Sequence, residues 1–170
     1  MNDNIALAMI VFVSALLQVT LVASLDIAGG TADVLLLALL SIALLRGAVT
    51  GAVAGFFGGL LVDIVTLDTL GVTALLYALA GYWTGRYGET TGRDRAHAPL
   101  LSIAVITVLY QISALVLRYM LGEPAHAHRI FAALGPTVLL NLILTVPVYA
   151  LTRRLLRPRE WVTREVRLLG

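Results

Sequence analysis

The sequence predicts an all-α integral membrane protein, folded as a compact bundle of six transmembrane helices. Of its 170 residues, 59% are hydrophobic and 13% are charged, and the mean hydropathy is +0.93. Soluble domains contain roughly 45–50% apolar and 25% charged residues. Apolar stretches near membrane-spanning length follow one another along the chain, and arginines separate alternate stretches. The glycines, charges and polar residues of the apolar stretches are therefore interpreted as lying in a lipid bilayer.

Four apolar stretches approach or reach the length of about 17–25 residues that a helix needs to cross a bilayer. They are residues 5–25, 70–85, 100–121 and 134–156. The remaining apolar segment is longer, and inside it the only charge is that of Arg46, which Gly47 follows. It forms either one overlong helix or two short helices that turn at this pair of residues.

The distribution of arginine favours two short helices and therefore six spans. With both termini in the cytoplasm, the outer side holds only Arg118 and Arg129, and the inner side holds the rest of the twelve basic residues. Inner loops of membrane proteins carry such an excess. A five-span arrangement would instead place Arg46 inside the bilayer, at a cost of about 2.5 kcal/mol or more. We expect the second and third spans at residues 31–45 and 47–65.

The six spans are expected to form one domain, residues 1–156, followed by a basic cytoplasmic tail, residues 157–170. Apolar and basic residues fall on different faces of a helix through the tail, which suits a helix lying on anionic lipid. A frayed basic tail near the lipid is an equal alternative. The chain contains no nucleic-acid recognition module, so anionic lipids are the expected partner of this charge. The expected lipid-facing residues are Arg153, Arg154, Arg157, Arg159, Trp161, Arg164 and Arg167.

Glycine recurs at every fourth position along the expected third span, and the next step reaches a carboxylate. The series is Gly47, Gly51, Gly55, Gly59 and Asp63. Residues four apart lie on one helix face, and inside a bilayer small residues let another backbone come close. The fourth span has a similar strip of glycine and alanine from residue 71 to residue 85. The two strips either pack on each other, which is the favoured arrangement, or face partner proteins.

Three aspartates are expected at the ends of spans. Asp33 opens the second span and Asp68 precedes the fourth, so each is predicted to cap a helix N-terminus. Asp63 closes the third span, where the helix dipole disfavours an anion. It therefore needs donors, either from the start of the fourth helix or from an outer arginine. It either ties the third and fourth helices together or contacts a partner protein.

Three uncharged polar residues lie inside spans: Gln18, Gln111 and Asn141. If the six-span order holds, Gln18 and Asn141 lie at similar depth in the outer half of the bilayer. They can bond each other or a partner helix, which indicates how the helices are oriented. Pro147 is expected to kink the last span, because proline cannot donate the backbone hydrogen bond of a helix interior.

Catalytic and metal-binding patterns are missing from the sequence. The chain has no cysteine, which excludes disulfides and thiolate metal sites. His126 and His128 supply two ligands without a third. The segment 88–93 is rich in glycine but lacks the Gly-Lys-Ser/Thr ending of a phosphate-binding loop. We expect no enzymatic activity, no metal and no cofactor.

Four segments resemble the bacterial rod-shape-determining protein family MreD. They are Asp33-Val-Leu-Leu-Leu, Arg46-Gly47, the run Gly-Phe-Phe-Gly-Gly-Leu-Leu-Val-Asp at 55–63, and Leu-Gly-Val-Thr-Ala-Leu at 70–75. The family usually has proline before the first aspartate, where this chain has Ala32. The residues that match the family motif are Asp33, Gly55, Phe56, Gly59, Asp63, Leu70 and Gly71.

The resemblance implies a non-enzymatic scaffold of the cell-elongation machinery, which synthesises peptidoglycan and maintains rod shape. It implies direct binding to MreC, and indirect association with MreB and with the synthase formed by RodA and a class B penicillin-binding protein. It also implies a location in the bacterial inner membrane. The family fold is similar to that of the substrate-binding subunits of energy-coupling-factor transporters. The alternative function is therefore a small-molecule-binding subunit of a membrane transporter.

Overall fold

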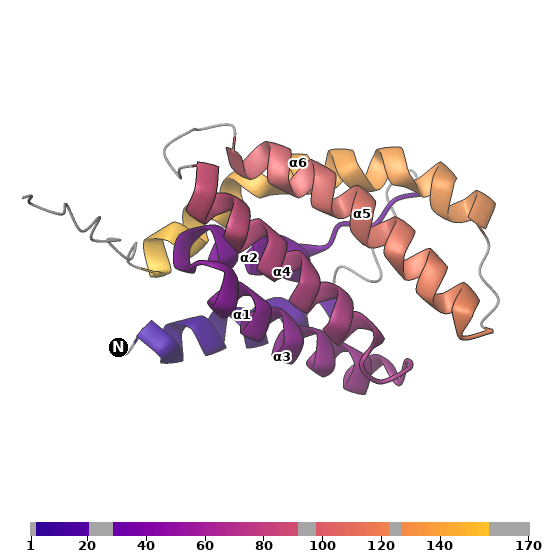
Figure 1. Ribbon diagram of the computed structural model, residues 1–170, viewed down its shortest axis with the longest axis horizontal. Helices are drawn as coiled ribbons and strands as arrows, with labels where there is room; N and C mark the ends of the chain where they lie inside the picture. Colours follow the sequence, from indigo (N-terminus) through magenta and orange to yellow (C-terminus); the bar gives the residue numbers. More distant parts are fainter. Residues whose placement is uncertain (1–2, 21–28, 92–97, 123–126, 157–170) are drawn as a thin grey trace, which may run out of the picture.

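The computed structural model describes residues 3–20, 29–91, 98–122 and 127–156. These residues form six helices that pack side by side in one bundle (Figure 1). The predicted all-α class is confirmed. In chain order the helices are α1 (Asp3–Thr20), α2 (Val34–Arg46), α3 (Ala48–Thr66), α4 (Val72–Thr91), α5 (Ala98–Met120) and α6 (Ala127–Leu155).

Helix α2 is the core of the bundle. It contacts each of the other five helices, and every residue from 35 to 45 is buried. Its 13 residues are almost all leucine, isoleucine and alanine. At a rise of 1.5 Å per residue α2 is about 20 Å long, whereas the hydrocarbon core of a bilayer is about 30 Å thick. It is therefore a short helix, as expected, and protein encloses it.

The break between α2 and α3 lies where Arg46-Gly47 predicts it. Helix α2 ends at Arg46 and α3 begins at Ala48. Gly47 between them has φ 94° and ψ 178°, a conformation essentially restricted to glycine. Its N–H still donates to the carbonyl of Ala43 at 2.8 Å. The observed helices start and end within one to three residues of the expected spans, 31–45 and 47–65.

Helices α3 and α4 form the closest pair in the bundle. A methyl group added to Gly59 would lie 2.6 Å from the backbone nitrogen of Ala74, and one added to Gly51 would lie 2.7 Å from the carbonyl oxygen of Gly81. A methyl group on Gly55 would overlap the backbone of Tyr77. The two small-residue strips therefore pack on each other, as the favoured arrangement predicted.

The outer surface of the bundle has the character of a membrane protein. Three helical segments are long and apolar enough to cross a bilayer: Ala48–Thr66, Leu100–Met120 and Ile130–Leu155. The described parts of α1 and α2 are apolar but shorter. Large apolar side chains are exposed along α1, α3, α5 and α6. Helix α6 contains both Pro136 and Pro147, so two backbone donors are missing inside it.

Candidate functional site

The start of α2 is held by a carboxylate that joins two helices. Asp33 is the N-cap: its Oδ1 accepts a hydrogen bond from the N–H of Leu36 at 2.9 Å. The predicted cap is therefore confirmed. Its Oδ2 accepts a second bond, at 2.7 Å, from the hydroxyl of Tyr77 on α4. The Tyr77 ring lies 5.2 Å from the ring of Tyr110 on α5, centroid to centroid.

The amide of Gln18 connects α1 to the same point. Its Nε2 donates to the carbonyl of Ala32 at 3.2 Å, and its Oε1 accepts from the N–H of Val34 at 2.8 Å. The side chain thus spans the backbone on either side of Asp33. A bond between Gln18 and Asn141 was one of the expected arrangements, but it does not form. The partner of Gln18 is the backbone that leads into α2.

Asn141 of α6 completes the junction. Its Oδ1 accepts from the N–H of Asp33 at 2.8 Å, and its Nδ2 donates to the hydroxyl of Thr107 on α5 at 3.1 Å. Asn141 is fully buried. Side chains from α1, α4, α5 and α6 are therefore all connected at the start of α2, which fixes these five helices relative to one another.

A polar cavity of about 290 Å³ lies beside this junction. Asp33 and the two tyrosines, Tyr77 and Tyr110, line it together with Gln111 and Thr137. Most of its other lining residues also carry hydroxyl, amide or charged groups. Such a lining can form hydrogen bonds with water or with a polar ligand.

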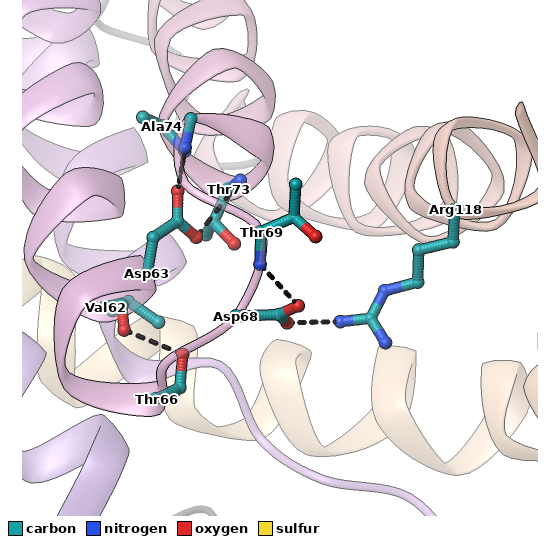
Figure 2. A network of polar contacts seen from close by, with 9 residues as sticks. Val62, Asp63, Thr66, Asp68, Thr69, Thr73, Ala74 and Arg118 are labelled. Atoms are coloured by element: carbon teal, nitrogen blue, oxygen red, sulfur yellow. Dashed lines mark hydrogen bonds and ion pairs between the residues drawn. The ribbon is translucent and has the colours of Figure 1, made fainter. Parts of the chain in front are cut away.

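Asp63 ties α3 to α4. The residue is 0% exposed, and its carboxylate accepts a hydrogen bond from the backbone N–H of Gly71 at 2.8 Å. It also accepts from the N–H groups of Thr73 at 3.3 Å and Ala74 at 3.4 Å (Figure 2). These donors belong to the first turn of α4 and the residue before it, which have no partner within the helix. The favourable dipole at the start of α4 offsets the unfavourable one at the end of α3.

The expectation that Asp68 caps α4 is wrong. Its Oδ1 accepts from the adjacent N–H of Thr69 at 2.8 Å, and its Oδ2 pairs with the guanidinium of Arg118 on α5 at 2.8 Å (Figure 2). The reason is that Asp63, reaching across a short turn, already occupies the donors at the start of α4. Arg118 consequently pairs with Asp68 and connects α5 to the α3–α4 turn.

A sequence model of the rod shape-determining protein family MreD matches residues 2–159. The chain belongs to the MreD family. No curated protein and no solved structure gives a match. The matched range covers all six helices and both aspartate networks. Membership gives the chain a role in the determination of rod shape, and its apolar helices agree with a membrane location.

Most of the motif residues expected to distinguish the MreD family contribute to internal structure. Asp33 and Asp63 cap helices, and Gly71 has φ +93° and donates to Asp63. The turn glycine and the three strip glycines, Gly47, Gly51, Gly55 and Gly59, are all buried. Phe56 and Leu70 differ, because 46% and 67% of their surfaces are exposed. A contact with a partner protein remains a prediction for these residues.

The expected lipid-binding residues are only partly described. Arg153 and Arg154 are exposed in the last turn of α6, where a positive charge interacts favourably with the helix dipole. The remaining members of the set lie outside the described residues, so the amphipathic tail stays a prediction. They are Arg157, Arg159, Trp161, Arg164 and Arg167.

The sequence analysis missed Tyr77, Tyr110 and the cavity that they line. A tyrosine inside an apolar span is itself a signal, because its buried hydroxyl requires a hydrogen-bond partner. The partner of Tyr77 is 44 residues away, and spacing along one helix cannot reveal it. Among the residues that the structure describes, no three histidine, aspartate or glutamate side chains come together as metal ligands.

Proposed function

We propose that the chain is a non-enzymatic membrane scaffold that binds MreC within the cell-elongation machinery and so helps to maintain rod shape. The observation that carries this proposal is the family match over residues 2–159. The proposed arrangement has six spans in the bacterial inner membrane, with both termini in the cytoplasm. The basic end of α6 and the tail would then lie against anionic lipids.

The MreC-binding surface that we propose is the α3 face, made of Val53, Phe56, Phe57 and Ile64 of α3 together with Leu70 of the α3–α4 turn. All five side chains are exposed. The two phenylalanine rings pack edge to face, with centroids 5.6 Å apart. The buried motif residues have a structural role inside the bundle, whereas the side chains of Phe56 and Leu70 are largely exposed. Large aromatic side chains are also the usual anchors of protein interfaces.

MreC would connect this scaffold to the rest of the machinery. The synthase of RodA and a class B penicillin-binding protein, and MreB, would then associate indirectly. The segments between consecutive helices contain too few residues for a domain that could reach the cell wall. Any effect on the wall must therefore pass through the partner, by favouring one of the conformations that MreC populates.

Co-purification with MreC tests the α3 face directly. We expect Phe56→Ala and Leu70→Ala each to reduce captured MreC about 5–30-fold, the range for interface anchors that contribute about 1–2 kcal/mol. Phe131→Ala and Leu139→Ala are matched controls, because both residues are exposed on α6.

Thermal unfolding of each variant is the control for misfolding, because a folded variant with reduced capture has lost the contact and not the fold. Undiminished capture by the α3 variants, or equal losses in the α6 variants, would refute the proposed surface. Substitutions at Gly55 or Asp63 are unsuitable for this test, because both residues hold α3 against α4.

The polar cavity favours a second candidate function, a small-molecule-binding subunit of a transporter. Its volume of about 290 Å³ is close to the lower limit of ligand pockets, roughly 300–1,000 Å³. The docking helix of such subunits usually carries alanines four residues apart, and the first span here does not. Stabilisation of the purified chain by a vitamin, with no capture of MreC, would support this candidate over the scaffold.

A further inference from the structure

The cavity beside the start of α2 has the volume of a small ligand. A water molecule occupies about 30 Å³ of liquid, so a cavity of 290 Å³ corresponds to about ten waters. Its lining includes residues of α1, α3, α4, α5 and α6. The junction joins α1, α2, α4, α5 and α6, so it fixes most of the cavity wall. A wall that is already ordered binds a ligand at a lower entropic cost.

Two polar side chains of the wall, Thr137 and Gln111, have no hydrogen-bond partner within the described chain. Thr137 is only 2% exposed, and its hydroxyl makes no hydrogen bond there. Two other buried threonines of α6 behave differently: Thr145 and Thr152 donate to backbone carbonyls at 2.6 and 2.8 Å. The amide of Gln111 in the wall also makes no bond to the described residues. Gln111 is half-buried, and both residues line the cavity, so their polar groups are available to bond water or a polar ligand there.

The charge of the wall disfavours an anion. Its ionisable carboxylates are Asp33 and Asp68, and its cation is Arg118. Arg118 is paired with Asp68 at 2.8 Å, which leaves the formal charge of Asp33 unbalanced by a cation in the wall. The groups that remain without partners are hydroxyls and an amide, which both donate and accept hydrogen bonds.

We propose that this cavity binds a hydroxyl-rich, non-anionic group of monosaccharide size, with Thr137 and Gln111 as its hydrogen-bonding residues. The group is either a free sugar or the sugar headgroup of a membrane glycolipid. Hydroxyls of such a ligand donate and accept, which satisfies both kinds of free group in the wall. The rings of Tyr77 and Tyr110 would contact its apolar C–H faces. Binding here does not depend on MreC.

Ligand-observed saturation-transfer NMR on the full chain tests the ligand class. The chain is prepared in phospholipid nanodiscs without any sugar-based detergent, and the probes are glucose, galactose and glucuronate. We expect the two neutral sugars to bind, and glucuronate to bind at least about tenfold more weakly because of the Asp33 charge. Binding by neither neutral sugar, or equal binding of glucuronate, would overturn the proposal.

Three variants test the site. We expect Thr137→Val and Gln111→Leu each to weaken binding about 3–10-fold, as for one uncharged hydrogen bond. Thr152→Val is the control, because its buried hydroxyl bonds the backbone of the same helix outside the cavity. If Thr137→Val binds the neutral sugars as well as the control does, the assignment fails.

A glycolipid distinguishes the two sources of the sugar. If glucosyl diacylglycerol in the nanodisc displaces bound glucose, the site takes a lipid headgroup, and if it does not, the site takes a free sugar. MreC capture by the Thr137 variant is measured in parallel. We expect it to be unchanged, so that failure of the sugar site and failure of the scaffold proposal are separate results.

Discussion

At the scale of single residues, the polar side chains of this protein are used mainly to complete the backbone of helix ends. Inside a bilayer an unpaired backbone N–H costs several kcal/mol, because no water is available to replace the missing partner. Asp33 and Asp63 each supply acceptors to such N–H groups, at the starts of α2 and α4. The first of these caps was predictable because its donor is three residues away. The bond of Asn141 to Asp33 joins residues 108 apart, and no local pattern contains it.

The two aspartates near the α3–α4 turn should differ in their effect on stability. We expect Asp63→Ala to lower the free energy of unfolding by about 1–3 kcal/mol, because it leaves buried N–H groups of α4 without an acceptor. Asp68→Ala removes an exposed ion pair with Arg118 and should cost no more than about 1 kcal/mol. Unfolding in detergent, followed by circular dichroism, measures both. Equal losses would mean that the Asp63 bonds contribute little.

The two amides on α5 and α6 form a second matched pair. Asn141→Leu breaks the bonds to Asp33 and Thr107, and we expect it to cost about 1–2 kcal/mol, as for strong interhelical bonds in membranes. Gln111→Leu breaks no bond among the described residues and should leave the unfolding transition unchanged. The same unfolding measurement applies. A larger loss from Gln111→Leu would contradict the hydrogen-bond pattern described here.

At the scale of helices, the sequence predicts small-residue strips but not their neighbours. A strip with a four-residue period marks one face of α3, and a second strip marks α4. Either strip alone could face another helix of the chain or a partner. Which neighbour each strip contacts depends on the short turn after residue 66, because this turn brings α4 back along α3. Asp63 holds the turn in place. The break at Gly47 was easier to predict, because a charge beside a glycine lies inside an otherwise apolar segment.

Alanine substitutions of three glycines should lower stability by different amounts, according to how closely each glycine is packed. A methyl group on Gly55 would overlap the backbone of Tyr77, which cannot move aside. One on Gly58 would meet the side chains of Val11 at 3.1 Å and Leu35 at 3.4 Å, and side chains can shift. One on Gly135 would meet nothing beyond its chain neighbours, of which Pro136 is one.

We therefore expect Gly55→Ala to cost the most and Gly58→Ala less. Gly135→Ala should cost the least, because the helix propensity of alanine offsets its crowding against the ring of Pro136. The melting temperatures of the three variants should follow this order. A Gly55 variant as stable as the Gly135 variant would contradict the α3–α4 interface.

At the scale of the whole molecule, hydropathy and the distribution of arginine predicted the number and order of the helices but not their positions in the bundle. Helix α2 is apolar on all sides, and such a helix is equally suited to lipid and to a protein interior. The structure places it in the centre, where all its residues from 35 to 45 are buried. Its short length follows from that position, because the surrounding helices rather than lipid cover it. The cavity also could not be predicted, since all six helices contribute to its wall.

The six-span order makes a prediction about which ends of the bundle share a compartment. The chain has no cysteine, so single cysteines report position without background. Leu67 in the α3–α4 turn is 91% exposed, and Arg153 is exposed in the last turn of α6. In intact cells a membrane-impermeant maleimide should label Leu67→Cys, and it should label Arg153→Cys only after permeabilisation, because arginine-rich ends stay in the cytoplasm.

Labelling of both variants in intact cells would contradict the six-span order. The result also bears on the cavity, because Asp68 of the α3–α4 turn lines it. If Leu67→Cys is labelled from outside, the cavity lies toward the outer side of the membrane. A sugar would then reach the cavity from the periplasm or from the outer leaflet. A mutation that closes the cavity should therefore abolish sugar binding and leave the labelling of Arg153→Cys on the cytoplasmic side unchanged.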